Sequence, residues 1–515
     1  MTIAVLIAAV ALALIAYSQF QADAFVLYGY EVDSLHAIDS VARLASGDTP
    51  HVDYPTALGY LAFAPVSFFA HIGLPIGAAF VASQFLVAGC ILLAALWVGV
   101  SRLNAPAALV LLLSIIFVTT AVTIHVDPDE VTFGGHYNRW AWSVAFVLIT
   151  ISFLPGRSER AASVDGIVIG TGYLCLLLLK VTFVIGLAPF TVFLLAKSGR
   201  WRTFAAAAVT GGILILGWTV YFGLGYWISY AENLVWVSSG ELRPYAGNSL
   251  SDLSLHPIVA SCALLTFATS VFLAIRDTIA NAIGFLVLAI GCFFIAYQNF
   301  GNLPLWIVAQ TIVLIALFPR LEVRNKLLPL ISYLSLTLGS LAISANLLFG
   351  MAVSALRGPA SDNVTDAVAL FEASLTVVEA SDIKASHSRL TRIEETRADR
   401  CDDPAILRPV LEIADELAGL EGAVFVADVV APYWLFGVGQ RVPGSPPWNY
   451  GSLRGLENAN YILVPICPFR EPHSKSIVRR LDQLGMLKQP IVSSAWFALY
   501  SNTNTETKES RFGDD

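Results

Sequence analysis

The chain has 515 residues, of which 56% are hydrophobic and 13% are charged, and its formal net charge is −8. Soluble domains carry about 25% charged residues, so most of this chain is not an ordinary soluble fold. The absence of a basic tract argues against a nucleic-acid partner. Repeated apolar runs near the roughly 20 residues that cross a bilayer predict a polytopic α-helical membrane protein.

The first apolar run covers residues 1–20, and no Lys or Arg precedes it. A secretory signal begins with a basic region, so we expect this run to remain as the first span, with cleavage after residues 22–24 as the alternative. An acidic loop, 21–55, follows. Residues 57–74 are apolar but short and contain Pro65, which favours an interfacial helix on the outer face over a span.

Further spans are expected along the rest of the N-terminal domain, which we place at residues 1–349. The run 166–196 is interrupted by Lys180, and we predict that two short helices turn there, with a re-entrant pair as one form of this arrangement. The count is about 11 spans, the others lying near 76–100, 107–124, 140–154, 204–223, 257–275, 282–297, 304–319 and 327–349.

Basic loops prefer the cytoplasm, and this preference sets the expected orientation. Five basic segments are placed inside, and the polar loops 21–55, 125–139 and 224–256 then lie outside together with everything after residue 350. The five segments contain Arg102, Arg157 with Arg160, Lys197 to Arg202, Arg276, and Arg320 to Lys326.

Residues 350–503 have the polarity of a soluble fold and are expected to form a small periplasmic α/β domain. Helical stretches alternate with strand-like runs, which is typical of such a unit. Cys401 and Cys467 are candidates for one disulfide in an oxidising compartment. Residues 504–515 are polar and expected to be disordered. The helical stretches are Thr365–Val378, Ala405–Leu420 and Ser474–Leu484, and the strand-like runs are Ala423–Val430, Tyr461–Val464 and Trp496–Tyr500.

The first outer loop concentrates acids and histidines between residues 31 and 53. Asp33 lies about a dozen residues past the first span, at a depth where a lipid head group is met. A carboxylate there is suited to deprotonate an acceptor. Asp33 and His36 share one face of a predicted helix, with Leu35 and Ile38 on the other. The alternative is a solvated loop acid.

This passage resembles the first outer loop of the GT-C superfamily, especially the protein mannosyltransferase and lipid A aminoarabinose transferase branch. Those proteins follow their first span with an Asp-Glu pair, an aromatic-bearing amphipathic helix, a Gly-Asp turn and a Tyr/Pro-rich entry to the next apolar helix. Ser34 stands where the Glu would be, and Glu31 is its possible substitute. The other matching positions are Asp33, His36, Gly47-Asp48 and Tyr54-Pro55.

The resemblance implies a GT-C-like fold and a polyprenyl-phosphate-linked sugar as donor. It also implies that Asp33 is the catalytic base, with Glu31, His36, Asp53 and Tyr54 binding substrate. The resemblance covers residues 1–200 at the level of motifs, covers 200–350 only as a span count, and does not extend to the C-terminal domain.

The second outer loop holds Asp127, Asp129 and Glu130. Oxygen ligands at this spacing suit a hard divalent cation such as Mg or Mn, and an exposed turn at Pro128 is the alternative. His136, Tyr137, Asn138 and Arg139 follow at the entrance of a span. They are candidates for substrate binding, with Arg139 on a phosphate, or for an interfacial anchor.

Lys180 is the sharpest single signal, because a Lys among 31 apolar residues is costly and usually functional. In GT-C proteins a similarly placed cation faces the lipid phosphate, and snorkelling to the interface is the alternative. In the third loop Arg243 is a further candidate phosphate ligand. Its aromatic neighbours are typical of an interfacial belt.

The sequence therefore predicts a glycosyltransferase of a bacterial inner membrane that acts at the outer face. The acceptor would be an envelope lipid, a glycan or a protein. A transporter or a non-enzymatic scaffold is the alternative, and a transporter should show paired broken helices in two halves.

Overall fold

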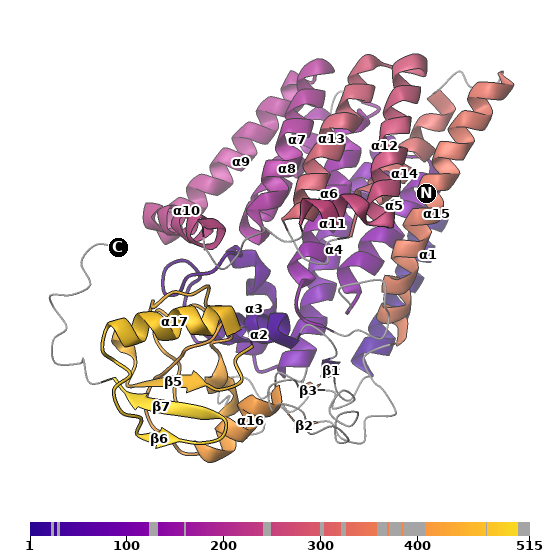
Figure 1. Cartoon of the computed structure of the whole chain (residues 1–515). Coiled ribbons are helices and arrows are strands. Elements are labelled where there is room, and N and C mark those ends of the chain that lie inside the picture. Colours follow the sequence, from indigo (N-terminus) through magenta and orange to yellow (C-terminus); the bar gives the residue numbers. More distant parts are fainter. Residues whose placement is uncertain are drawn as a thin grey trace.

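A computed structural model gives the fold (Figure 1). It describes residues 1–21, 25–27, 31–122, 132–158, 161–239, 249–298, 303–320, 326–357, 368–369, 383–385, 407–469 and 471–502.

Among the described residues, seven helices are long and apolar enough to cross a membrane. Many of their outward-facing residues are large and apolar, which suits contact with lipid. The chain is thus a polytopic helical membrane protein. The seven are α1 (Thr2–Phe20), α4 (Ile76–Arg102), α7 (Ala161–Leu179), α9 (Trp201–Phe222), α12 (Pro257–Arg276), α13 (Ile279–Tyr297) and α15 (Leu327–Arg357).

Shorter helices fill the centre of this bundle. They are α5 (Ala105–Thr120), α6 (His136–Phe153), α8 (Val181–Lys197) and α14 (Trp306–Leu317). Nearly every side chain of α6 is buried, because α6 packs against α4, α5, α7, α8 and α14.

Basic residues gather at one end of the bundle. Arg102 pairs with Asp165 and donates to the Leu154 carbonyl, while Arg200 donates to the Ile151 carbonyl at 2.8 Å. Three of the loops expected on the same side of the membrane therefore lie together. From this end of the bundle, α7 runs to Lys180 at the opposite end.

Helices occupy parts of the polar segments between the apolar runs. α2 (Glu31–Ala45) and α3 (Ala64–His71) follow the first span, with η1 (Tyr60–Ala62) between them, and α3 is too short to cross a bilayer. The loop expected at 224–256 is wrong in part, since α10 (Leu224–Ser239) and α11 (Leu250–Leu255) occupy much of it. Aromatic side chains of α10 pack on the C-terminal end of α7, which stabilises a helix that composition did not indicate.

The C-terminal residues form the expected small α/β unit. Its sheet has the order β4-β5-β7-β6, with β4 and β5 parallel and the other pairs antiparallel. α17 covers one face of the sheet through Ile477 and Leu481. α16 belongs to the apolar cluster that contains the remaining buried side chains of the sheet. The elements are α16 (Leu407–Glu416), β4 (Val424–Val426), η4 (Tyr433–Phe436), η5 (Leu456–Asn458), β5 (Tyr461–Pro465), α17 (Glu471–Gln483), β6 (Val492–Ser493) and β7 (Phe497–Ser501).

The structure differs from the sequence prediction in one domain boundary and in one element that follows it. α15 continues to Arg357, past the expected domain boundary at 349. Within the predicted helix Thr365–Val378, residues 368–369 are instead strand β2 (Val368–Ala369), which pairs with β3 (Ile383–Ala385), and β3 pairs with β1 (Phe25–Leu27). Cys467 is disulfide-bonded, and Cys401 lies outside the described residues.

Candidate functional site

Helix α2 carries Asp33 and is anchored by its apolar face. Leu35, Ile38 and Val41 are completely or almost completely buried, as the helical spacing predicted. α2 packs against α3, and in Figure 1 both lie between the helical bundle and the C-terminal domain. This packing fixes Asp33 at the end of the bundle that faces the C-terminal domain.

Ser34 fastens the second outer segment to α2. Its hydroxyl oxygen accepts hydrogen bonds from the backbone N–H groups of Phe133 and Gly134 at 3.0 and 3.3 Å, and it lies 2.9 Å from the Thr132 hydroxyl. The approach is close, because a Cβ added at Gly134 would lie 2.4 Å from the Asp33 Cβ. Ser34 thus joins α2 to residues 132–134 beside Asp33.

His136 ties the start of α6 to the segment before α3. Its Nδ1 lies 2.7 Å from the Phe133 carbonyl oxygen, and its Nε2 lies 2.6 Å from that of Ala62. The ring also packs edge-on to Phe80. Both ring nitrogens therefore contact backbone, and His136 holds together segments that surround Asp33.

Lys180 stands at the break between α7 and α8, as the sequence predicted. Its extended backbone ends one helix and begins the next, so carbonyl groups at the end of α7 need partners from elsewhere. Tyr230 donates its hydroxyl to the Leu177 carbonyl at 3.0 Å, and Gly59 donates its N–H to that of Leu179 at 3.2 Å. At Gly59 any Cβ would collide with the Leu178 carbonyl oxygen at 2.2 Å.

The side chain of Lys180 lies among residues of the other outer segments. It is only 8% exposed. Its Nζ is 3.5 Å from the Asn138 amide oxygen and 5.3 Å from the centre of the Tyr137 ring. The ammonium also acts electrostatically on Asp33. Three of the predicted site residues, Tyr137, Asn138 and Lys180, thus come together from α6 and the α7–α8 break, and a fourth, Asp33 on α2, lies within electrostatic range of Lys180.

Burial and charge set the protonation of this cluster. Removal from water raises the pKa of Asp33 from 3.8 to about 6, and the nearby Lys180 cation opposes that rise. His36 is one turn further along α2, and burial lowers its pKa from 6.5 to about 4. At neutral pH, therefore, Asp33 is an ionised carboxylate close to its pKa and His36 is neutral.

Thr182 is a candidate that sequence reasoning missed. It lies in the first turn of α8, beside Lys180, and its buried hydroxyl has no hydrogen-bond partner among the described residues. The backbone N–H groups of a helix N-terminus attract anions. Lys180, Thr182 and the start of α8 together offer an ammonium, a hydroxyl and backbone donors to an anionic group.

The remaining predicted residues of the first two loops differ from one another in burial and in hydrogen bonding. Asp53 is exposed, and its carboxylate accepts the Thr49 N–H at 2.7 Å within a local turn. Tyr54 is buried, and its hydroxyl donates to the Ser40 carbonyl at 3.3 Å. Glu31 begins α2, with its side chain outside the description, and Arg139 is buried in α6.

Two predictions fall on parts of the chain that are not described. Arg243 is one, and the other is the metal set of Asp127, Asp129 and Glu130. Within the described ranges, no group of three or more His, Cys, Asp or Glu residues is placed to hold a metal ion.

Comparisons with protein-family models, curated proteins and solved structures find no match to this chain.

Proposed function

We propose that the chain is a GT-C-like membrane glycosyltransferase that moves a sugar from a polyprenyl-phosphate donor to an envelope lipid, glycan or protein. The observation that carries this proposal is the meeting of Asp33 and Lys180. A carboxylate with a pKa near 6 and a nearly buried ammonium lie within electrostatic reach, although 147 positions separate them in the sequence.

Asp33 acts as the base. The acceptor hydroxyl oxygen forms a bond to the anomeric carbon while the bond between that carbon and the phosphate oxygen breaks, and the acceptor proton passes to Asp33. A base whose pKa lies near the working pH is the most effective, so the raised pKa suits this task.

Lys180 holds the phosphate of the departing lipid. Charge accumulates on that phosphate as the bond breaks, and a fixed cation with helix N-terminal donors stabilises it. Thr182 and Asn138 flank this position. Arg139 and Arg243 remain further candidates for the same phosphate, and the acidic loop 127–130 remains a candidate for Mg or Mn.

The placement in the membrane is part of the proposal. Adding the shorter helices α5, α6, α8 and α14 to the seven long ones gives 11 crossings. With Arg102, Arg157 and Arg200 in the cytoplasm, α2 and the C-terminal domain face the periplasm of a bacterial inner membrane. The site then lies where lipid-linked donors present their head groups.

Turnover of polyprenyl-phosphate sugars by the purified protein in lipid nanodiscs tests the proposal. We expect transfer to rise with pH through a midpoint near 6, because Asp33 must lose its proton to act as base and its pKa is about 6. Titration of His36 does not obscure this rise in activity, since its pKa is about 4. The proposal is overturned by the absence of transfer with every donor and acceptor class, or by transfer that persists unchanged at pH 4.

A further inference from the structure

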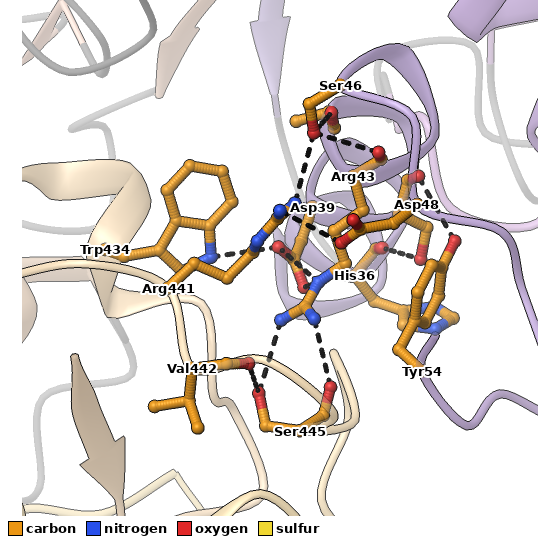
Figure 2. Close-up of polar contacts among 12 residues, drawn as sticks. His36, Asp39, Arg43, Ser46, Asp48, Tyr54, Trp434, Arg441, Val442 and Ser445 are labelled. Carbon is orange, nitrogen blue, oxygen red and sulfur yellow. Dashed lines mark hydrogen bonds and ion pairs between the residues drawn. The ribbon is translucent and has the colours of Figure 1, made fainter. Parts of the chain in front are cut away.

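Helix α2, which carries Asp33, contacts the C-terminal domain through several polar side chains (Figure 2). The centre of this contact is a buried ion pair within α2, in which Arg43 Nε donates to the two Asp39 oxygens at 3.1 and 3.0 Å. Both side chains are at most 2% exposed. A charge pair this deeply buried is tolerated only when its remaining donors and acceptors are satisfied.

The C-terminal domain supplies those partners. Trp434 donates its indole N–H to Asp39 at 2.9 Å. Arg43 donates to the backbone carbonyl of Ser445 at 3.1 Å and to its hydroxyl at 3.4 Å. The pair therefore loses much of its hydrogen bonding if the domain separates from α2.

A second, more exposed pair lies at the end of α2. The Arg441 Nη2 and Asp48 Oδ2 atoms are 2.9 Å apart, and the two side chains are 25% and 29% exposed. Arg441 also donates to the Ser46 hydroxyl at 3.2 Å. These side chains tolerate substitution better than the buried pair, because water can still reach them.

A third contact reaches the turn of α2 next to Asp33. The His36 ring lies 5.6 Å from the Trp448 ring and 6.0 Å from that of Phe63, centre to centre. His36 is thus enclosed between the C-terminal domain and the segment before α3, only three residues from Asp33.

We propose that the docked C-terminal domain positions Asp33 by clamping α2, with Asp39, Arg43, Trp434, Ser445, Asp48 and Arg441 as positioning residues. An isolated helix of 15 residues is marginal in water, so α2 depends on its packing. The apolar face fixes its depth, and the polar contacts with the C-terminal domain fix its rotation and lateral position. This inference deepens the proposed function, because the catalytic use of Asp33 rests on that function.

Charge exchange across the exposed pair tests the clamp while leaving the Asp39 and Arg43 side chains in place. The variants are Asp48→Arg, Arg441→Asp and the double variant, each in the full-length protein in nanodiscs. Glu471→Arg is the matched control, because it reverses a charge in the same domain on a side chain that is 67% exposed and pairs with Lys475 one turn along the same helix.

The readout is modification of Asp33 by a hydrophobic carbodiimide, which reacts with protonated carboxyl groups, measured by mass spectrometry against pH. We expect a midpoint near 6 in the unchanged protein and in Glu471→Arg. Each single reversal should move the midpoint toward 3.8, because a loosened α2 admits water to Asp33. A midpoint that is lower by one pH unit reduces the protonated fraction of Asp33 at pH 7.5 about tenfold. The double variant should recover most of the change.

Equal midpoints in all four variants would overturn the clamp, as would a double variant no closer to the unchanged protein than either single variant. Amide hydrogen exchange in residues 33–45 gives a second measure and should rise in the single variants alone. Neither measurement requires transfer activity. A protein with a working clamp and no transferase activity would therefore contradict the proposed function and leave the clamp standing.

Discussion

Asp33→Asn is expected to lower the rate of sugar transfer by about 10²- to 10⁴-fold, the usual contribution of a positioned general base. Asn has almost the shape of Asp but cannot take a proton from the acceptor. The half-buried site and the Ser34 contacts next to it should persist. Single-turnover transfer at saturating donor measures this effect on the chemical step.

Two comparisons make that result specific. Asp252→Asn changes an exposed acid of α11 and should leave the rate within about twofold, as is usual for surface substitutions. Donor binding by Asp33→Asn, measured by displacement of a fluorescent lipid phosphate, should stay close to that of the unchanged protein. Undiminished transfer by Asp33→Asn would remove Asp33 from the role of base.

The largest loss of stability is expected from Arg43→Ala. Removing one member of a buried ion pair leaves the other charge uncompensated, which typically costs about 3–5 kcal/mol. Here Asp39 would keep only the Trp434 indole N–H of the contacts described above. Denaturant unfolding followed by the fluorescence of tryptophans in the C-terminal domain should show this loss.

The matched variant replaces the pair as a whole. Asp39→Leu with Arg43→Met removes both charges with side chains of similar volume, and apolar replacement of a buried pair is often close to neutral. This double variant should therefore be much more stable than Arg43→Ala. If Arg43→Ala unfolds at the same denaturant concentration as the unchanged protein, the buried pair does not hold the domain on α2.

Much of the helical architecture was predictable because apolar runs of membrane length have few other structures available. The break at Lys180 was equally visible, since one charge interrupts 31 apolar residues. α10 was not predicted, because its mixture of aromatic and polar residues resembles an interfacial loop. Its stability comes from packing on the end of α7, which no local pattern contains.

The candidate site was predictable only in part. Asp33 and Lys180 each stood out by their position relative to apolar runs. That they meet depends on contacts of Ser34 and Gly59, which have no distinctive local signal. Asp39 and Arg43 have the i, i+4 spacing of an ordinary exposed pair. Their partners, Trp434 and Ser445, lie some 400 positions away.

The pKa of Asp33 in the presence and absence of the Lys180 cation tests the central claim most directly. It is measured as the pH midpoint of carbodiimide modification in the unchanged protein and in Lys180→Met. If the two side chains face each other in one site, the midpoint lies near 6 in the unchanged protein and rises further in Lys180→Met, because the cation favours the ionised carboxylate. A midpoint near 3.8 in the unchanged protein, or one that Lys180→Met leaves in place, would contradict the site described here.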